Sequence, residues 1–301
     1  MGPAKKRASA VKTLHTPATG RIGRAHRHER VRRRLLQPAG VIAILILVLG
    51  APFWVIVVTA GKSVSEARNP DLTLPTHWEI GQNILTALDQ GNMFAAFAGS
   101  LVLLVPSVFG VLLLGAMASW VLARRKGRGV AIAYAIGISG IIVPPAVVMI
   151  VLLLRQIGLS GTAVGMIGVY IGMYLSTVIF FVTGFVRTIP VELEEAARVD
   201  GADPLAVFFR ILLPLLGPVL STATILVSLF IWNDVFYALF VVGGHMNTLP
   251  LDLYQVASSG LYLQNWNLIF AYVILMTIPL LLVFIVAQRR IVSGITSGAV
   301  K

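Results

Sequence analysis

The side chains that could carry out chemistry are sparse in this chain and form no catalytic pattern. The sequence contains no phosphate-binding G-x-x-x-x-G-K-S/T loop, no H-E-x-x-H zinc helix and no G-x-S-x-G nucleophile turn. It has no cysteine, which excludes disulfides, thiolate metal sites and cysteine nucleophiles. The five histidines are scattered, without the spacing of metal ligands: His15, His26, His28, His77 and His245. The sequence therefore predicts no enzyme active site, no metal site and no cofactor bound by this chain.

The most informative polar segment lies between two long apolar stretches, where residues 194–214 read EEAARVDGADPLAVFFRILLP. Pro190 predicts a helix start just before it, because proline suits a first turn and biases its predecessor away from helical angles. Three glutamates then fall near the positive end of the helix dipole, which favours acidic groups: Glu192, Glu194 and Glu195. Gly201 lies where this helix would end in a left-handed residue.

A second short helix is predicted directly afterwards. Asp203 can cap it through its side chain, and Pro204 suits the first helical position. Pro214 would end it at the entry to the next apolar stretch. Phe208 and Phe209 would lie at the membrane boundary, where an exposed apolar cluster usually indicates an interface.

These residues leave two interpretations of the segment. Small side chains at Ala196, Ala197 and Gly201 leave a smooth surface that another backbone can approach closely, which favours a docking site for a second protein. An amphipathic helix lying on the membrane surface fits equally well. Spacing alone does not separate the two.

The elements that must position this segment are strongly apolar. Hydrophobic residues make up 57% of the chain and charged residues 12%, with a mean hydropathy of +0.88. The charged share is about half of the ~25% found in soluble domains. Residues 1–36 hold eleven of the 24 Lys and Arg and a single acid, so most of the +12 net charge belongs to this tail. Because the tail has no aromatic residue to stack on bases, we expect a disordered cytoplasmic arm and no nucleic-acid binding.

Six windows free of Asp, Glu, Lys and Arg each exceed the ~20 residues needed to cross a bilayer core. They predict six membrane-spanning helices, near 37–60, 94–122, 131–154, 163–186, 216–241 and 266–288. Pro144-Pro145 predicts a kink in the third. The first outer loop, 61–93, is expected to be an extended lead into a short surface helix.

Basic residues predict the orientation, since they gather on the cytoplasmic side of a membrane. With the N-terminus in the cytoplasm, the inside segments contain 21 Lys and Arg and the outside segments three. Both termini are therefore expected in the cytoplasm. The loop 187–215, which contains the polar segment, would face the cytoplasm between spans four and five.

This loop also contains a recognisable signature. The pattern E-A-A-(x3)-G-(x9)-I-x-L-P is present without gaps: Glu195, Ala196, Ala197, Gly201, Ile211, Leu213 and Pro214. It resembles the signature of permease subunits of binding-protein-dependent ATP-binding-cassette (ABC) importers, in which the loop forms a coupling helix that inserts into a cleft of the ATPase subunit. The resemblance implies an ATPase-coupling role for these residues and their neighbours Asp200, Asp203, Pro204 and Phe208.

The resemblance extends over most of residues 90–301. The stretches FIWNDVFYALFVVGGHMNTLPLDLY (230–254) and GITSGAVK (294–301) are similar to the second membrane subunit of carbohydrate importers of the maltose type. The chain departs from that pattern in two ways. Asp234 stands where members commonly have Glu, and the basic N-terminal arm is longer.

The resemblance implies an all-α polytopic membrane fold of the type I ABC importer permeases. We expect a basic tail (1–36), a first span with its outer loop (37–93), a five-helix core that includes the coupling loop (94–288), and a cytoplasmic C-terminal tail (289–301). The implied partners are a second homologous permease, two cytosolic ATPase subunits that bind ATP and Mg, an extracytoplasmic sugar-binding protein and the lipid bilayer. The implied location is the cell membrane of a bacterium or archaeon.

Asp234, with Trp232 and Asn233, is the candidate for the translocation pathway. A carboxylate in lipid costs ~2.5–3.5 kcal/mol on insertion scales, so Asp234 should face protein or a water-filled cavity. It would contact sugar hydroxyls or the binding protein, or it would be hydrogen-bonded between spans to hold the subunit together. The second interpretation is slightly favoured.

A different class of transporter, driven by an ion gradient, is the alternative hypothesis. Such a secondary transporter needs intramembrane ionisable residues and usually an internal repeat of its spans. The sequence offers one candidate carboxylate and no repeat. It therefore favours the ATP-driven importer.

Overall fold

The computed structural model describes residues 40–42, 44–90, 92–143, 145–258 and 265–299, with backbone only at 90, 283, 284 and 286–299. The predicted basic tail, residues 1–36, lies outside this described part. The chain divides into two units, residues 1–54 and 55–301.

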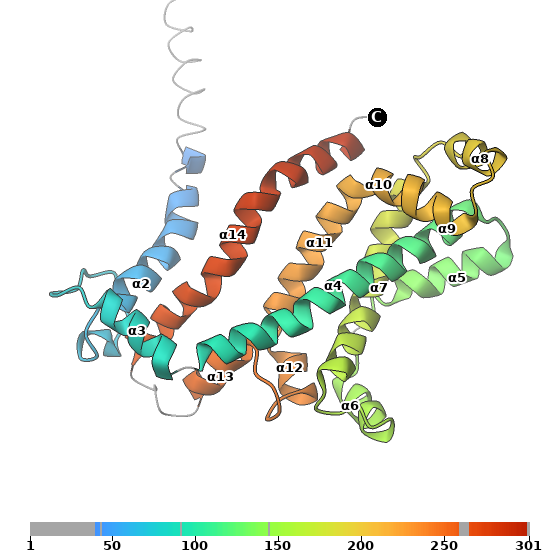
Figure 1. The fold of residues 1–301 in the computed structure, drawn as a ribbon. Helices are drawn as coiled ribbons and strands as arrows, with labels where there is room; N and C mark the ends of the chain where they lie inside the picture. The colour runs from blue at the N-terminus through green and yellow to red at the C-terminus, as the bar shows by residue number, and fades with distance from the viewer. Residues whose placement is uncertain (1–39, 43, 91, 144, 259–264, 300–301) are drawn as a thin grey trace, which may run out of the picture. The chain divides into compact units, whose positions relative to one another are not determined.

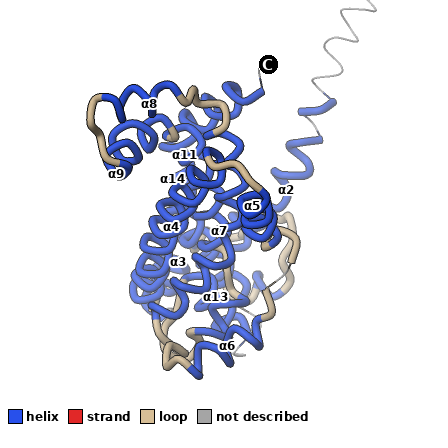
Figure 2. The backbone as a smooth tube through the Cα atoms, turned by 90° about the vertical axis from the view of Figure 1, so that its right-hand side faces the viewer, coloured by secondary structure: helices blue, strands red, loops and turns tan. Residues whose placement is uncertain are grey.

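The described part of the chain is helical and contains no strand (Figures 1 and 2). This confirms the predicted all-α class. In chain order, the elements are η1 (Ile46–Gly50), α2 (Ala51–Ala60), η2 (Glu66–Arg68), α3 (Ile80–Gln90), α4 (Met93–Arg124), α5 (Arg128–Ser139), α6 (Val147–Gln156), α7 (Ala163–Val186), α8 (Glu192–Val199), α9 (Pro204–Ala206), η3 (Val207–Leu212), α10 (Leu213–Leu215), α11 (Gly217–Trp232), α12 (Phe236–Val241), α13 (Leu249–Ser258) and α14 (Trp266–Ala299).

Among the described residues, three helices are long and apolar enough to cross a membrane: Gly40–Ala60, Met93–Arg124 and Ala163–Val186. They coincide with predicted spans one, two and four. A bent pair, Pro204–Leu215 with Gly217–Trp232, would make a fourth candidate. The count of six spans stays a prediction, because the remaining apolar helices are shorter.

The helices α4 and α7 pack against each other in the second unit and form much of its core. Gly110 on α4 permits a close approach, because a Cβ there would lie 2.6 Å from Ile171 Cδ1. Gly115, further along the same helix, has the same role, since its Cβ would lie 2.5 Å from Val178 Cγ1. Small residues of this kind bring the backbones of membrane helices together.

The prediction of a continuous third span over 131–154 is wrong. The helix α5 ends at Ser139 and α6 begins at Val147, with turn and extended residues described between them. Pro145 contributes to this break, because it has no amide hydrogen for a helical bond and restricts the angles of its predecessor. The structure has an interruption where the sequence predicted a kink.

The predicted fifth span, 216–241, is also interrupted, so its prediction as one helix is wrong. The helix α11 ends at Trp232, and α12 begins at Phe236. Asp234 lies in the break and starts the new helix, because its carboxylate accepts hydrogen bonds from the amides of Tyr237 (3.2 Å) and Ala238 (2.9 Å). The last helix, α14, continues past the predicted end of span six at residue 288 to Ala299.

The segment after α2 has the expected short helix, α3. Its Asn83 side chain donates hydrogen bonds of 2.9 Å to the carbonyls of Ala60 and Lys62. Asn267 of α14 in turn donates a 2.9 Å bond to Asn83 Oδ1. These buried amides fasten α3 to the end of α2 and to the start of α14.

Candidate functional site: the helix pair between α7 and α11

The segment between α7 and α11 folds as the predicted pair of short helices (Figure 1). The first, α8, begins two residues after Pro190 and has three glutamates in its first turn. After its last residue, Val199, Gly201 adopts a φ of +87°, which confirms the predicted left-handed end. A Cβ on Gly201 would meet no atom within 4 Å, so the backbone angle alone favours glycine here.

The second helix begins as predicted. The Asp203 side chain accepts a 3.0 Å hydrogen bond from the amide of Ala206, and Pro204 is the first helical residue. The cap satisfies one of the amides that have no partner in a first helical turn.

The end of the second helix differs from the prediction. The helix continues through Pro214 to Leu215 and bends by 76° where it joins α11, so Pro214 does not end it. The turns before Pro214 are π-helical, and the amide of Leu213 bonds to the carbonyl of Phe208, five residues back. These wider turns accommodate a residue that lacks an amide hydrogen.

Phe208 is fully buried, which corrects the prediction that it lies exposed beside Phe209. Its ring packs against Trp120 of α4, with 5.7 Å between centroids. Phe209 is 46% exposed. Because successive helical side chains point about 100° apart, only one ring of an adjacent pair can face the core directly. Phe208 therefore contributes to the helix pair by internal packing.

Glu194 is the residue of this site that the sequence analysis missed. Assigned there only to the helix dipole, it is 1% exposed. Its carboxylate accepts hydrogen bonds from Arg124 Nε (2.7 Å) and Trp120 Nε1 (2.9 Å). The one available signal was the spacing of Trp120 and Arg124, which lie one turn apart at the end of a predicted span. That spacing does not identify which of the three glutamates is their partner.

The remaining motif residues lie towards the outside of the helix pair. Seven are exposed: Glu195, Ala196, Asp200, Gly201, Asp203, Pro204 and Pro214. Three are partly buried: Ala197, Ile211 and Leu213. Next to them in sequence, Val199 is 86% exposed and Leu205 is 58% exposed. Exposed apolar side chains of this kind suit a protein contact.

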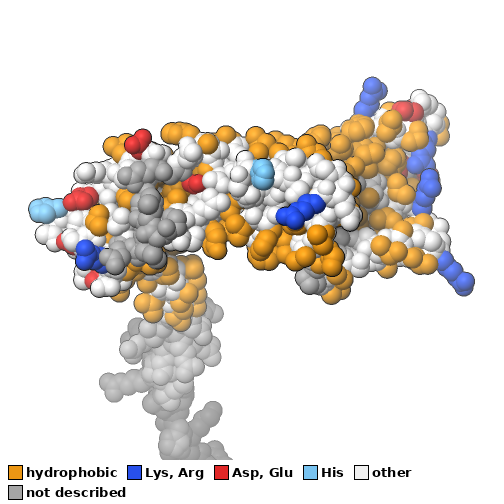
Figure 3. All heavy atoms as spheres, turned by 90° about the horizontal axis from the view of Figure 1, so that it is seen from below, with side chains coloured by type: hydrophobic (Ala, Val, Ile, Leu, Met, Phe, Trp, Pro, Cys, Tyr) orange, Lys and Arg blue, Asp and Glu red, His pale blue; other side chains and the backbone are white. Residues whose placement is uncertain are grey.

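The surroundings of the turn are polar and charged. A hollow of about 420 Å³ is lined by Asp200, Gly201, Ala202, Asp203, Ala206, Arg210 and Ile211. Lys and Arg side chains gather at the end of the second unit where α8 and α9 lie (Figure 3). The exposed apolar Val199 and Leu205 thus lie close in sequence to the charged Asp200 and Asp203.

The three pathway candidates have different surroundings. Asp234 joins α7 to α12, because its Oδ2 accepts a 2.9 Å hydrogen bond from the Tyr170 hydroxyl as well as one from α12. Trp232 is buried and packs edge-on against Phe97 of α4, with 6.2 Å between centroids. Asn233 is exposed, and its amide bonds to a carbonyl of its own helix. This geometry favours the interpretation of Asp234 as a link between helices.

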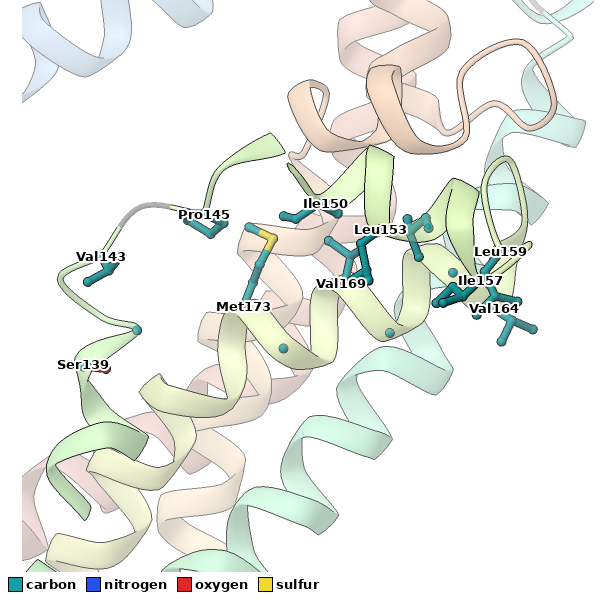
Figure 4. A pocket seen from close by; sticks show the side chains of 15 residues that line it. Ser139, Val143, Pro145, Ile150, Leu153, Ile157, Leu159, Val164, Val169 and Met173 are labelled. Atoms are coloured by element: carbon teal, nitrogen blue, oxygen red, sulfur yellow. The ribbon is translucent and has the colours of Figure 1, made fainter. Parts of the chain in front are cut away.

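The break in the predicted third span leaves two apolar hollows beside α7. One, of about 580 Å³, lies between α6 and α7 and is lined almost entirely by aliphatic side chains (Figure 4). The other, of about 800 Å³, is bordered by Tyr174 and Phe230, whose rings stack 5.6 Å apart at 14°. The interrupted segments therefore border hollows that open to the surface of the second unit.

In the described part of the chain, no group of three or more His, Asp and Glu side chains is arranged to hold a metal ion. His77 and His245 are exposed there, and the other three histidines lie outside it.

Several helices long and apolar enough to cross a membrane, with a short helix pair anchored to their core, indicate a polytopic membrane protein. The family model described as "Binding-protein-dependent transport system inner membrane component" matches residues 111–297. The match covers residues 111–124 of α4 and nearly all of α14, and includes the whole helix pair. The chain belongs to this family and is a permease component of a binding-protein-dependent transport system.

Individual relatives cover most of the chain. It is 31% identical over 261 residues, 84% of each chain, to the diacetylchitobiose uptake system permease protein NgcG of Streptomyces coelicolor. It is also 31% identical over 278 residues, 91% of this chain and 99% of the relative, to the probable starch degradation products transport system permease protein AmyC of Thermoanaerobacterium thermosulfurigenes. The trehalose transport system permease protein SugB of Mycobacterium tuberculosis is 37% identical over 204 residues, 66% of this chain and 73% of the relative.

Among solved structures, the chain resembles a subunit of a bacterial ABC transporter involved in import of the acidic polysaccharide alginate. The TM-score is 0.71, with 21% identity over 91% of this chain and 99% of the other. This likeness establishes the fold. The alternative of an ion-gradient-driven transporter finds no support in any of these comparisons.

Proposed function

We propose that this chain is one of two permease subunits of an ATP-driven sugar importer, and that its helix pair between α7 and α11 couples ATP hydrolysis to transport. The substrate class is supported by relatives that are named for diacetylchitobiose, starch degradation products and trehalose. The coupling role is supported by one observation above all. The helix pair is fastened inwardly by Glu194 and Phe208 while it presents exposed Val199 and Leu205 outwardly.

The proposed orientation has six spans and both termini in the cytoplasm. In this arrangement α5 with α6 forms span three, and α11 with α12 forms span five. The gathering of Lys and Arg at the end where the helix pair lies supports a cytoplasmic position for that end (Figure 3).

The proposed partners follow from this role. Two cytosolic ATPase subunits would bind ATP and Mg, a second permease would complete the pathway, and an extracytoplasmic binding protein would deliver the sugar. Closure of the ATPase dimer would push on the residues from Glu195 to Pro214. The pair would move as one body and rock the spans between inward-facing and outward-facing states.

The test of the coupling role is Gly201→Asp, compared with Gly127→Asp. Both glycines have positive φ, and a Cβ added at either would meet no atom within 4 Å, but Gly127 lies in the loop between α4 and α5. In the complete transporter in proteoliposomes, Gly201→Asp should abolish most sugar-stimulated ATPase activity and uptake. Gly127→Asp should retain both. Normal stimulated activity in Gly201→Asp would overturn the coupling role.

The pathway proposal is tested separately at Asp234. If the carboxylate mainly links α7 to α12, Asp234→Asn should lower the amount of protein recovered from the membrane, because both carboxylate oxygens accept hydrogen bonds and an amide offers only one accepting oxygen. If Asp234 contacts solute, the variant should accumulate and assemble normally with impaired uptake. Quantitative immunoblotting of membranes, together with uptake per assembled complex, separates the two.

A further inference from the structure

The first helix of the pair, α8, has little apolar attachment to the rest of the chain. It spans eight residues, and Glu194 is its one buried residue. Its apolar side chains Leu193 and Val199 are 45% and 86% exposed. An isolated helix of this length is not stable in water, so its position depends on what holds it. What holds α8 is a carboxylate.

Both oxygens of that carboxylate are occupied. Oε1 accepts the 2.7 Å hydrogen bond from Arg124 Nε, and Oε2 accepts the 2.9 Å bond from Trp120 Nε1. Arg198, one turn further along α8, lies 3.6 Å from Oε2 at the surface. Charge-assisted bonds to two donors on one helix fix the direction of a side chain as well as its position.

The donors belong to the last turns of α4, the predicted second span. Arg124 also donates a 2.9 Å hydrogen bond through Nη2 to the carbonyl of Ile189, in the linker that leads into α8. Trp120 packs against Phe208 of the second helix of the pair. The end of α4 therefore contacts the linker before α8, α8 itself and the second helix.

We propose that Glu194 is a positioning residue that locks α8 to the cytoplasmic end of α4, so that displacement of the helix pair moves the second span directly. This inference rests on the proposed coupling function. It adds a second path by which movement of the pair could reach the membrane helices. The backbone joins the pair directly only to α7 and α11, whereas Glu194 links it to α4. With the lock in place, α8 cannot rotate or slide on α4 without breaking the bonds of a buried charge.

The first experiment compares Glu194→Gln with Glu192→Gln in the complete transporter in proteoliposomes. Glu192 is an exposed residue of the same first turn, so it serves as the matched control. We expect Glu194→Gln to retain the ATPase subunits on purification and to retain basal ATP hydrolysis. Sugar transported per ATP should fall about tenfold, within the range of coupling between sites. The control should match the wild type.

The double variant Glu194→Gln/Arg124→Gln tests whether the two residues act through one link. Its sugar transported per ATP should be no lower than in the more impaired of the two single variants, Glu194→Gln and Arg124→Gln, because both substitutions remove the same contact. Additive losses, or an unchanged transport ratio in Glu194→Gln, would overturn the inference. If the wild type itself shows no ATP-driven uptake and purifies without an ATPase, the proposed function fails instead.

A distance measurement keeps the inference testable if Glu194→Gln accumulates poorly. The chain has no cysteine, so spin labels can be introduced at Glu192→Cys on α8 and Lys126→Cys after α4 before the partners are added. In the otherwise wild-type chain, we expect one narrow distance distribution that is the same with and without a non-hydrolysable nucleotide. The distance distribution should broaden in Arg124→Lys, because this variant lacks the Nε donor to Glu194. A nucleotide-dependent distance in the wild type would show that α8 moves independently of α4.

Discussion

The two helices of the pair between α7 and α11 are attached to the bundle by different forces. The first, α8, is attached through one buried carboxylate, Glu194. The second, Pro204–Leu215, buries Val207, Phe208 and Leu212 completely. Apolar burial is non-directional and supplies most of the stability, whereas a charge-assisted contact sets an orientation. Burial of the second helix therefore stabilises the pair, and the carboxylate of the first sets its orientation.

The largest effect is expected in the second helix, because its apolar burial supplies most of the stability of the pair. Phe208→Ala removes a fully buried ring and should lower the free energy of unfolding by about 3–5 kcal/mol. Phe209→Ala, at the adjacent exposed position, should change it by no more than about 0.5 kcal/mol. Thermal unfolding of the detergent-solubilised chain, followed by tryptophan fluorescence, measures both. Equal changes in the free energy of unfolding for the two variants would contradict the finding that Phe208 is buried and Phe209 is not.

A moderate effect is expected at the start of the second helix. Asp203→Ala removes the cap on the Ala206 amide and should cost about 1 kcal/mol of local stability. Asp200→Ala is the control, because Asp200 is an exposed aspartate of the same turn and the cap of the second helix is Asp203. Hydrogen exchange of residues 204–212 should speed up in the first variant and stay unchanged in the second. Faster exchange in both would mean that the turn, and not the cap, holds the helix start.

The smallest effect is expected for an ion pair with one exposed partner, Asp71 (54% exposed), on a buried Lys62. It serves as the reference for the buried carboxylate of Glu194. Hydrogen bonds from Lys62 and from Thr73 lower the pKa of Asp71, in the loop between α2 and α3, to about 2. Because this pKa is depressed, its stabilisation is present above the ordinary aspartate value of about 4 and is lost as the pH falls towards 2.

Exchange protection of residues 62–73, corrected for the intrinsic rate, should therefore hold from pH 7 to pH 5 and decline below about pH 4. Asp71→Asn should remove this pH dependence without affecting uptake at neutral pH. A decline of the same size in the variant would assign the effect to other groups. Because Asp71 is about half exposed to solvent and Lys62 keeps its hydrogen bond to Thr73, the midpoint of global unfolding should hardly move.

Local patterns predicted local structure well. Ala163–Val186 has the bounds of predicted span four, and the Gly201 turn and the Asp203 cap lie where the sequence indicated them. Each depends on residues within one or two helical turns. Hydropathy did not predict the breaks at 140–146 and 233–235, because an apolar window does not report whether its backbone bonds are complete.

The site was predictable as a segment and less so as a set of contacts. The sequence indicated the signature from Glu195 to Pro214, but it assigned Phe208 to the surface and passed over Glu194. Both errors have one cause. Which side of a short helix faces the core depends on where the helix docks, and the partners Trp120 and Arg124 lie 74 and 70 residues away from Glu194.

By itself, the sequence determined an all-helical membrane protein, the order of its apolar segments and a helix pair with a glycine turn. These follow from hydropathy and from the backbone preferences of proline and glycine, which act locally. Tertiary structure alone decided that Glu194 is buried against α4, that Asp234 joins α7 to α12 and that two apolar segments are interrupted. Those outcomes depend on contacts between residues distant in the chain, where a buried polar group must find its partner in space.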